Sequence, residues 1–206
     1  MIRSLIGAVS LIVAAACSNA APDSDATEPA ETIEAKIQTP SQFIEIEQFQ
    51  SDHVIARNVS IWLPPNYDPD GTPYPVIYAH DGQNMFHPGH SGDNGKEWML
   101  DEIAERLMVE GKIRDVILVG IWSTDRRWQE YAPQKVMERI APSESSNWYG
   151  GSPQALEGDA YLTFITSELK PFIDASYNTS TGPQDTFTMG SSMGGSSSRA
   201  RGLTSW

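Results

Sequence analysis

The chain has 206 residues, a net charge of −13 and one cysteine. This length supports one domain with a sizeable core and is short for two, and a single cysteine excludes an intrachain disulfide. The sequence contains no run of Lys or Arg, which argues against a nucleic-acid partner because phosphate binding needs a basic face.

The first 17 residues have the pattern of an export signal. A positive start at Arg3 leads into a short apolar stretch that ends in small residues. This stretch is shorter than the roughly 20 residues of a membrane-spanning helix. Its end, Val13-Ala14-Ala15-Ala16-Cys17, resembles a bacterial lipobox. We expect Cys17 to be lipidated and the protein to be exported to the periplasm or cell surface, with a lipid anchor as its sole membrane contact. The alternative is ordinary cleavage at the alanines or after Ala20.

Residues 18–40 are rich in Ala, Pro, Thr, Asp and Glu and have few large apolar side chains. Such a segment cannot bury enough apolar surface to fold. We expect it to be a disordered acidic linker, with the folded domain over residues 41–206.

The domain begins with apolar patterns typical of strands. Alternating apolar residues predict two strands, over 43–49 and 59–63, and a turn rich in Pro and Asp follows the second. Short continuous apolar runs over 75–79 and 115–121 predict buried parallel strands. The first of these runs ends at His80-Asp81-Gly82-Gln83-Asn84, and ligands bind at this end of the strands in open α/β sheets.

Helical patterns alternate with these strands. Apolar residues over 100–108 follow the spacing of one helix face, with Gly111 as the stop. Residues 123–151 predict a long irregular stretch, and 161–173 predict a helix that Pro171 bends or ends. A last strand follows over 186–189. This order predicts an α/β fold with a mostly parallel sheet and flanking helices.

Directly after the last strand, Gly190-Ser191-Ser192-Met193-Gly194 matches the pattern G-x-S-x-G. In a nucleophile elbow the serine lies on a strained turn between a strand and a helix, and the glycines make room for it. The pattern predicts Ser192 as a nucleophile for a carbonyl carbon, with the Met193 amide facing the resulting oxyanion. The alternative is a loop that is merely rich in Gly and Ser.

Three blocks together resemble the Putative esterase family of α/β-hydrolases, which includes enterochelin-esterase-like and feruloyl-esterase-like members. The blocks are Ser60–Tyr67, Tyr74–Phe86 and Met189–Gly195, and the resemblance spans about residues 41–195. It implies an α/β-hydrolase fold that hydrolyses small-molecule or carbohydrate-linked carboxylic esters through an acyl-enzyme, without a cofactor. By analogy with related hydrolases, the amide of Gln83 is the second donor of the oxyanion hole, beside that of Met193.

Four further residues are candidates for shaping the substrate cleft: Asp81, Arg127, Trp128 and Glu130. Arg127 and Glu130 belong to the stretch Arg127…Glu130-Tyr131-Ala132-Pro133, which also looks familial. The alternative for Arg127, Trp128 and Glu130 is a surface ion pair and a packed tryptophan.

The histidines do not fit the order nucleophile, acid, histidine that this fold uses, because all four precede Ser192. His80 lies at the active edge of the sheet and is a candidate stand-in base, but we expect a structural role or a place lining the oxyanion hole. His87 and His90 have no partner at ligand spacing, so no metal site is expected. His53 is expected to face solvent.

Residues 196–206 lack an apolar period of helical type. We therefore expect a domain that is incomplete at its C-terminus through a frameshift or truncation, that lacks the catalytic histidine and acid, and that is inactive in this form. Two other functions stay open: a non-catalytic surface lipoprotein that binds a carbohydrate or another ligand, and an acyltransferase on the same fold.

Overall fold

The computed structural model describes residues 39–86, 97–137, 139 and 156–199. The predicted signal peptide, Cys17 and nearly all of the linker lie outside these residues, as do His87 and His90. In the part of the chain that is described, no helix is long and apolar enough to cross a bilayer.

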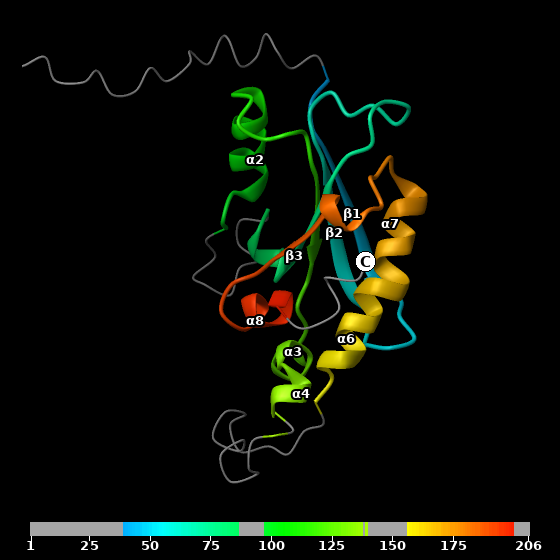
Figure 1. The fold of residues 1–206 in the computed structure, drawn as a ribbon, viewed down its shortest axis with the longest axis vertical. Helices are drawn as coiled ribbons and strands as arrows, with labels where there is room; N and C mark the ends of the chain where they lie inside the picture. The colour runs from blue at the N-terminus through cyan, green and yellow to red at the C-terminus, as the bar shows by residue number, and fades with distance from the viewer. Residues whose placement is uncertain (1–38, 87–96, 138, 140–155, 200–206) are drawn as a thin grey trace, which may run out of the picture.

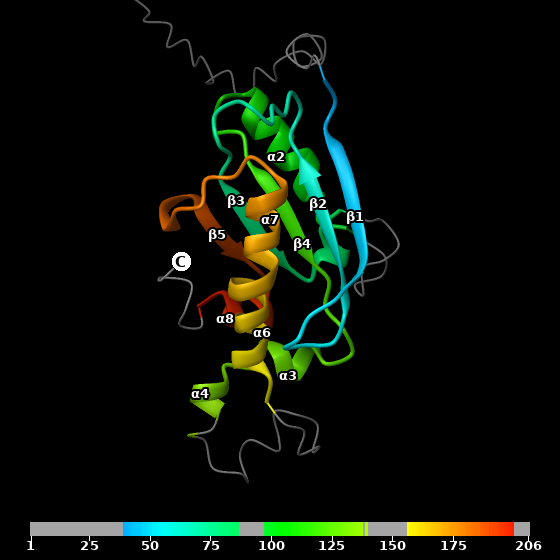
Figure 2. The same ribbon diagram turned by 90° about the vertical axis from the view of Figure 1, so that its right-hand side faces the viewer.

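Five strands form one sheet, in the order β1-β2-β4-β3-β5 (Figure 2). They are β1 (Gln42–Phe49), β2 (Arg57–Leu63), β3 (Val76–His80), β4 (Ile117–Ile121) and β5 (Thr186–Met189). β3 pairs in parallel with β4 and β5, whereas β2 pairs antiparallel with β1 and β4. The predicted α/β fold with flanking helices is confirmed. The described sheet is mixed, and its parallel part comprises β4, β3 and β5.

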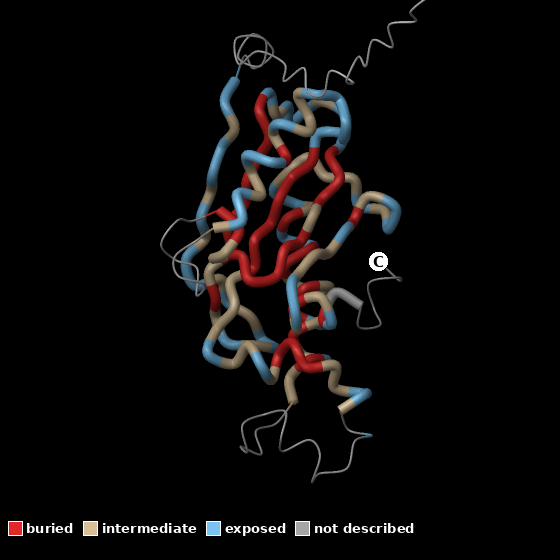
Figure 3. Tube along the Cα trace, turned by 90° about the vertical axis from the view of Figure 1, so that its left-hand side faces the viewer, coloured by how far each residue is buried: buried red, intermediate tan, exposed pale blue. Residues whose placement is uncertain are grey.

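Burial explains why the strand patterns differ. Every residue of β4 is buried, because helices cover both faces of the sheet, so its sequence reads as one continuous apolar run. β1 lies at an edge and alternates between exposed and half-buried residues. Figure 3 shows the buried residues concentrated in the central strands.

Helices cover the two faces of the sheet. The helix α2 (Leu100–Val109) packs on one face, and α6 (Gly158–Phe164) and α7 (Lys170–Ser176) pack on the other (Figure 1). The predicted stop of α2 is confirmed, since Gly111 has a φ of 70° just after the helix. Each face has its own core, and the larger core contains buried side chains of β2, β3 and β4 and of the helices Gly158–Ser176.

The helix does not end at Pro171. A π-helical turn, η2 (Ile165–Leu169), joins α6 to α7, and the N–H of Lys170 donates to the carbonyl of Ile165. Pro171 lacks an N–H and would crowd the carbonyl one turn earlier in a regular α-helix. The wider turn absorbs this irregularity, so the chain stays helical through the proline.

Two predicted irregular segments contain helices. Within 123–151, the structure has the short helices α3 (Arg127–Tyr131) and α4 (Gln134–Met137). They are too short to show an apolar period, and tertiary contacts hold α3, as shown below. After the last strand, which follows the 3-10 turn η3 (Pro183–Asp185), α8 covers Met193–Arg199 although the sequence predicts no apolar helix there.

Candidate functional site

Three loops meet where the parallel strands end. The register pairs His80 of β3 with Ile121 of β4, and Ala79 of β3 with Met189 of β5. The loops that begin after His80, Ile121 and Met189 therefore leave the sheet at the same edge. This edge is where open α/β sheets bind their ligands.

Ser192 occupies the strained position of a strand-to-helix turn. Its φ is 53°, in the left-handed region, and the residue is exposed. A residue with a Cβ pays about 1–2 kcal/mol for this conformation. A Cβ added to Gly190 would lie 2.6 Å from the carbonyl carbon of Gly194, so glycine is required there. The backbone at Ser192 has the form that the G-x-S-x-G pattern predicts.

The loop after β3 forms a tight turn beside this serine. Asp81 has a φ of 59°, the 3-10 turn η1 (Gly82–Asn84) follows, and the Asn84 N–H donates to the Asp81 carbonyl at 2.8 Å. A Cβ placed on Gly194, in the first turn of α8, would lie 3.3 Å from the Cβ of His80 and 3.5 Å from Oδ2 of Asp81. The structure thus brings the serine turn and the Gln83 turn together.

Met193 and Gln83, the predicted oxyanion donors, lie in these two turns. Met193 begins α8 and is half-buried against the core on the α6–α7 face. Gln83 is half-buried, and its carboxamide binds Ser123 in the loop after β4. The side chain of Gln83 is thereby held toward the loop that follows β4.

Asp81 and Arg127 form an ion pair. Nε of Arg127 lies 2.6 Å from Oδ1 of Asp81, and its terminal nitrogen lies 2.8 Å from Oδ2. The guanidinium also lies 4.9 Å from the ring centroid of Tyr131. The hydrogen bond to Asp81 raises the pKa of Arg127 above its ordinary value. Asp81 is buried, so its carboxylate faces the Arg127 guanidinium and not solvent.

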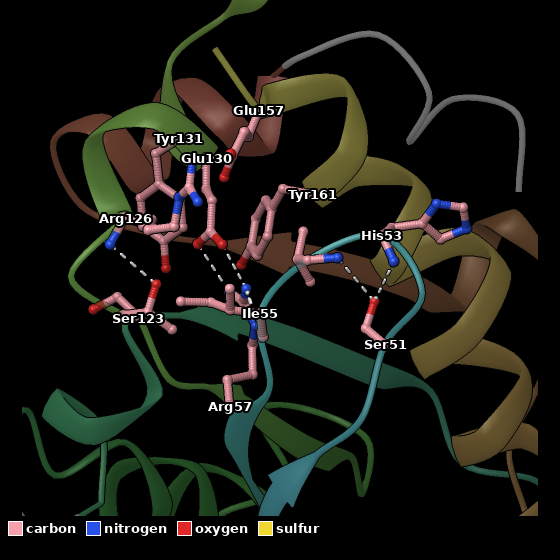
Figure 4. Close-up of polar contacts among 12 residues, drawn as sticks. Ser51, His53, Ile55, Arg57, Ser123, Arg126, Glu130, Tyr131, Glu157 and Tyr161 are labelled. Atoms are coloured by element: carbon pink, nitrogen blue, oxygen red, sulfur yellow. Dashed lines mark hydrogen bonds and ion pairs between the residues drawn. The ribbon is translucent and has the colours of Figure 1, made fainter. Parts of the chain in front are cut away.

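Glu130 is also a predicted cleft residue, but it lies in the interior. Its carboxylate accepts two hydrogen bonds from Arg57, at 3.0 Å and 2.6 Å, and both side chains are almost fully buried (Figure 4). The guanidinium lies over the rings of Tyr161 and Phe164. The structure therefore gives Glu130 a buried partner, and Glu130 also lines the cavity between α3, α4, α6 and α8. Trp128, two residues earlier in α3, is 53% exposed.

His80 is fully buried, and its ring is held from one side. Nδ1 lies 2.8 Å from the hydroxyl of Tyr161, whereas Nε2 has no hydrogen-bond partner within the described part of the chain. Burial lowers the pKa of His80 to about 4, an effect that Asp81 opposes and Arg127 reinforces. A buried neutral imidazole that does not bind Ser192 fits the predicted structural role. His53 is exposed, as predicted.

Two buried tyrosines lie under the site, and no role for them was predicted from the sequence. The Asp81 N–H donates to the Tyr131 hydroxyl at 3.1 Å, and the ring centroids of Tyr131 and Tyr161 lie 5.2 Å apart. Burial raises the pKa of both tyrosines, so both stay protonated at neutral pH. They link the turn after β3 to α3 and α6.

A cavity of about 400 Å³ lies between α3, α4, α6 and α8. Ser196 and Ser197, one turn after the serine elbow, form part of its wall, together with Pro133, Gly158 and Leu162. The cavity therefore lies beside α8, the helix that begins at Met193.

Comparison with known proteins places the chain in a family. The family model described as Putative esterase matches residues 55–203 of the chain. A curated relative, the uncharacterized protein YbbA of Bacillus subtilis (strain 168), is 27% identical over 139 residues. The alignment covers 68% of this chain and 48% of that relative, so the chain spans about half of the relative's length.

Three solved structures have a TM-score of 0.52 with this chain. They are an IroE-like serine hydrolase from Shewanella oneidensis (23% identity; 76% of this chain, 44% of that chain), a ferulic acid esterase (19%; 78% and 54%) and the enterobactin esterase FES from Shigella flexneri (16%; 82% and 36%). At these identities the likeness shows the fold alone.

Proposed function

Because the chain belongs to the Putative esterase family, we propose that the protein is a carboxylic ester hydrolase that acts through an acyl-enzyme at Ser192. One observation carries the proposal. An exposed serine with a φ of 53° lies between glycines, at the carboxyl end of a parallel strand and directly before a helix. This backbone form is what a nucleophile on such a fold needs.

The proposed reaction proceeds in two steps. Oγ of Ser192 adds to the ester carbonyl carbon while its proton passes to a base, and the carbonyl electron pair moves to the oxygen. The amides of Gln83 and Met193 stabilise that oxyanion, and loss of one such donor costs roughly 3 kcal/mol of transition-state stabilisation. The C–O bond to the alcohol then breaks and the alcohol takes the proton. Water hydrolyses the acyl-enzyme and restores Ser192.

The base in this proposal comes from outside the described residues. His80 has its Nδ1 on Tyr161, and its buried Nε2 binds no described group. His53 is exposed, 3.9 Å from Glu168. Because the chain spans about half of the relatives it matches, the proposal is one for the full-length protein.

We propose small-molecule or carbohydrate-linked esters as the substrate class. The acidic chain disfavours polyanionic substrates. Trp128 is 53% exposed on α3, beside Arg127, and offers a flat apolar surface to a ring. The ester-cleaving neighbours act on ligands that their names describe as ferulic acid or enterobactin, and these favour aromatic acyl groups as the first to test.

We also propose that the protein is exported and held at the membrane by a lipid on Cys17. The proposal rests on the sequence pattern of the first 17 residues. Tethered by residues 18–40, the folded domain would meet its substrate in the periplasm or at the cell surface.

The test is reaction of the full-length protein with a fluorophosphonate probe. Oγ of Ser192 attacks phosphorus, an O–P bond forms and fluoride leaves, so an activated serine becomes covalently labelled. We expect labelling of the wild type and none of Ser192→Ala, while Ser191→Ala, one residue away and also exposed, still reacts. A folded full-length protein without labelling at Ser192 would contradict the proposal and favour a ligand-binding role.

A further inference from the structure

The segment that follows β4 contacts the turn that follows β3 through two side chains, one in the loop after β4 and one at the start of α3. We propose that Ser123 and Arg127 are positioning residues that hold the oxyanion turn, defined as Asp81–Asn84, in the geometry its amide needs. The inference rests on the proposed function, since these residues would orient an amide that stabilises the oxyanion formed at Ser192. Neither residue touches the reacting atoms in this assignment.

The first contact clamps the side chain of Gln83. Its Nε2 donates to Oγ of Ser123 at 2.5 Å, and the Ser123 N–H donates to its Oε1 at 3.0 Å. One carboxamide is thus held at both ends, by one residue 40 positions later in the chain. Two bonds to one residue fix the orientation of the carboxamide plane, and this restricts rotation of the peptide unit that carries the Gln83 amide.

The second contact holds the start of the oxyanion turn. Both carboxylate oxygens of Asp81 accept hydrogen bonds from Arg127, and the Asp81 N–H donates to the Tyr131 hydroxyl. Arg127 and Tyr131 are the first and last residues of α3, so one short helix holds both the side chain and the backbone of Asp81. The φ of 59° at Asp81 needs such support, because a left-handed residue with a Cβ is unfavourable by about 1–2 kcal/mol.

The oxyanion turn packs closely against the backbone of β4. A Cβ on Gly82 would lie 2.4 Å from the carbonyl carbon of Gly120, so the turn rests directly on the backbone of β4. Because this contact fixes the position of the turn, the movement that remains is rotation of its own peptide units. The contacts with Ser123 and Arg127 oppose this rotation. Oxyanion donors act only when they are aimed before charge develops, because their reorganisation would otherwise cost part of the stabilisation.

This role has a kinetic signature that differs from substrate binding. Loss of either clamp should lower kcat and leave KM nearly unchanged, because the oxyanion exists only in the transition state. The expected decrease is about tenfold for Ser123→Ala and about tenfold to a hundredfold for Arg127→Gln, up to the effect of losing one donor. Ser123→Thr keeps the hydroxyl and should retain most of the rate.

The experiment measures fluorophosphonate labelling rates, kcat and KM with p-nitrophenyl acetate, and melting temperatures on the full-length protein. Two matched controls remove similar groups elsewhere. Ser180→Ala deletes a hydroxyl that donates to Asp185 at 2.7 Å, and Arg114→Gln breaks a pair with Asp185 at 2.5 Å. We expect the controls to react like the wild type.

The outcomes separate this inference from the proposed function. A wild type that is labelled at Ser192, with both clamp variants folded and as fast as the controls, overturns the inference alone. A wild type that is not labelled refutes both. An increase in KM without a decrease in kcat also overturns the inference, because it would place Arg127 or Ser123 on the substrate. If Arg127→Gln does not fold, Ser123→Ala and Ser123→Thr decide the question.

Discussion

The buried pair of Arg57 and Glu130 makes a sharp prediction about stability. Glu130→Gln removes one charge and leaves Arg57 in the interior, where its side chain is 1% exposed. Burial by itself lowers the pKa of Arg57, but the hydrogen bond and charge of Glu130 raise it above its usual range. Glu130→Gln removes these raising effects, but a guanidinium stays protonated at neutral pH even when it is buried. The positive charge of Arg57 therefore remains in the variant without its counter-ion.

The size of the effect follows from this burial. Removing one partner of a buried ion pair costs about 3–5 kcal/mol, because the other charge is left without compensation. The guanidinium keeps its bond to the Ile55 carbonyl and its place over two aromatic rings, which favours the lower half of this range. For a domain of this size, about 3–5 kcal/mol lowers the melting temperature by roughly 6–20 °C.

The assay is urea unfolding of the full-length protein, followed by tryptophan fluorescence. Glu110→Gln is the matched control, since it breaks an exposed pair with Lys112 and should leave the free energy of unfolding unchanged. The double variant Arg57→Met/Glu130→Leu removes both charges and should regain most of the loss. The reasoning is refuted if Glu130→Gln is as mild as the control, or if the double variant is no more stable than the single one.

Three further predictions concern other parts of the chain. Ser192→Gly should raise the free energy of unfolding by about 1 kcal/mol through release of backbone strain, whereas Ser192→Ala should not; equal stabilities in a thermal-shift assay would show that the turn is unstrained. Burial gives His80 a pKa of about 4, below that of the unfolded chain, so the unfolded state binds a proton that the folded state does not as pH falls from about 6.5 to 4. The free energy of unfolding should therefore fall by about 3 kcal/mol over this range, and His80→Gln should show a shallower decline in urea titrations; parallel curves would contradict this assignment. Cys17→Ser should move the protein from the membrane fraction to the soluble fraction in its native host, and unchanged fractionation would count against lipidation.

The sequence predicted those elements whose pattern is local. The runs 75–79 and 115–121 are continuous apolar stretches because β3 and β4 are covered on both faces, and burial of this kind is readable without knowing the partner. The G-x-S-x-G pattern carried part of its own backbone geometry, since its first glycine, Gly190, is required by the close approach of Gly194, four residues later. Both were predictable because the cause and the signal lie in the same segment.

The helix α3 was missed because its causes lie elsewhere in the chain. It has five residues, too few for an apolar period, and is held by Arg57 from 73 positions earlier and by Asp81 from 46 positions earlier. The sequence singled out Arg127 and Glu130 as unusual but did not reveal which way each side chain faces. Because these charged residues lie near the predicted ligand-binding edge of the sheet, we expected them to line a substrate cleft. The structure buries Glu130 almost completely.

These contacts give α3 two separate attachments, and this arrangement couples stability to the proposed site. Glu130 fixes the helix to β2, while Arg127 and Tyr131 hold Asp81. A helix of five residues has little rigidity of its own, so loosening the first attachment should loosen the second.

We therefore expect Glu130→Gln to slow fluorophosphonate labelling of Ser192 even at temperatures where the variant is fully folded. The double variant Arg57→Met/Glu130→Leu distinguishes anchoring from charge. If packing alone anchors α3, this variant recovers stability and labelling rate together. If it recovers stability while Ser192 stays slow, the ion pair itself anchors α3. If Glu130→Gln is labelled as fast as the wild type, α3 does not transmit its anchoring to Asp81, and the coupling is wrong.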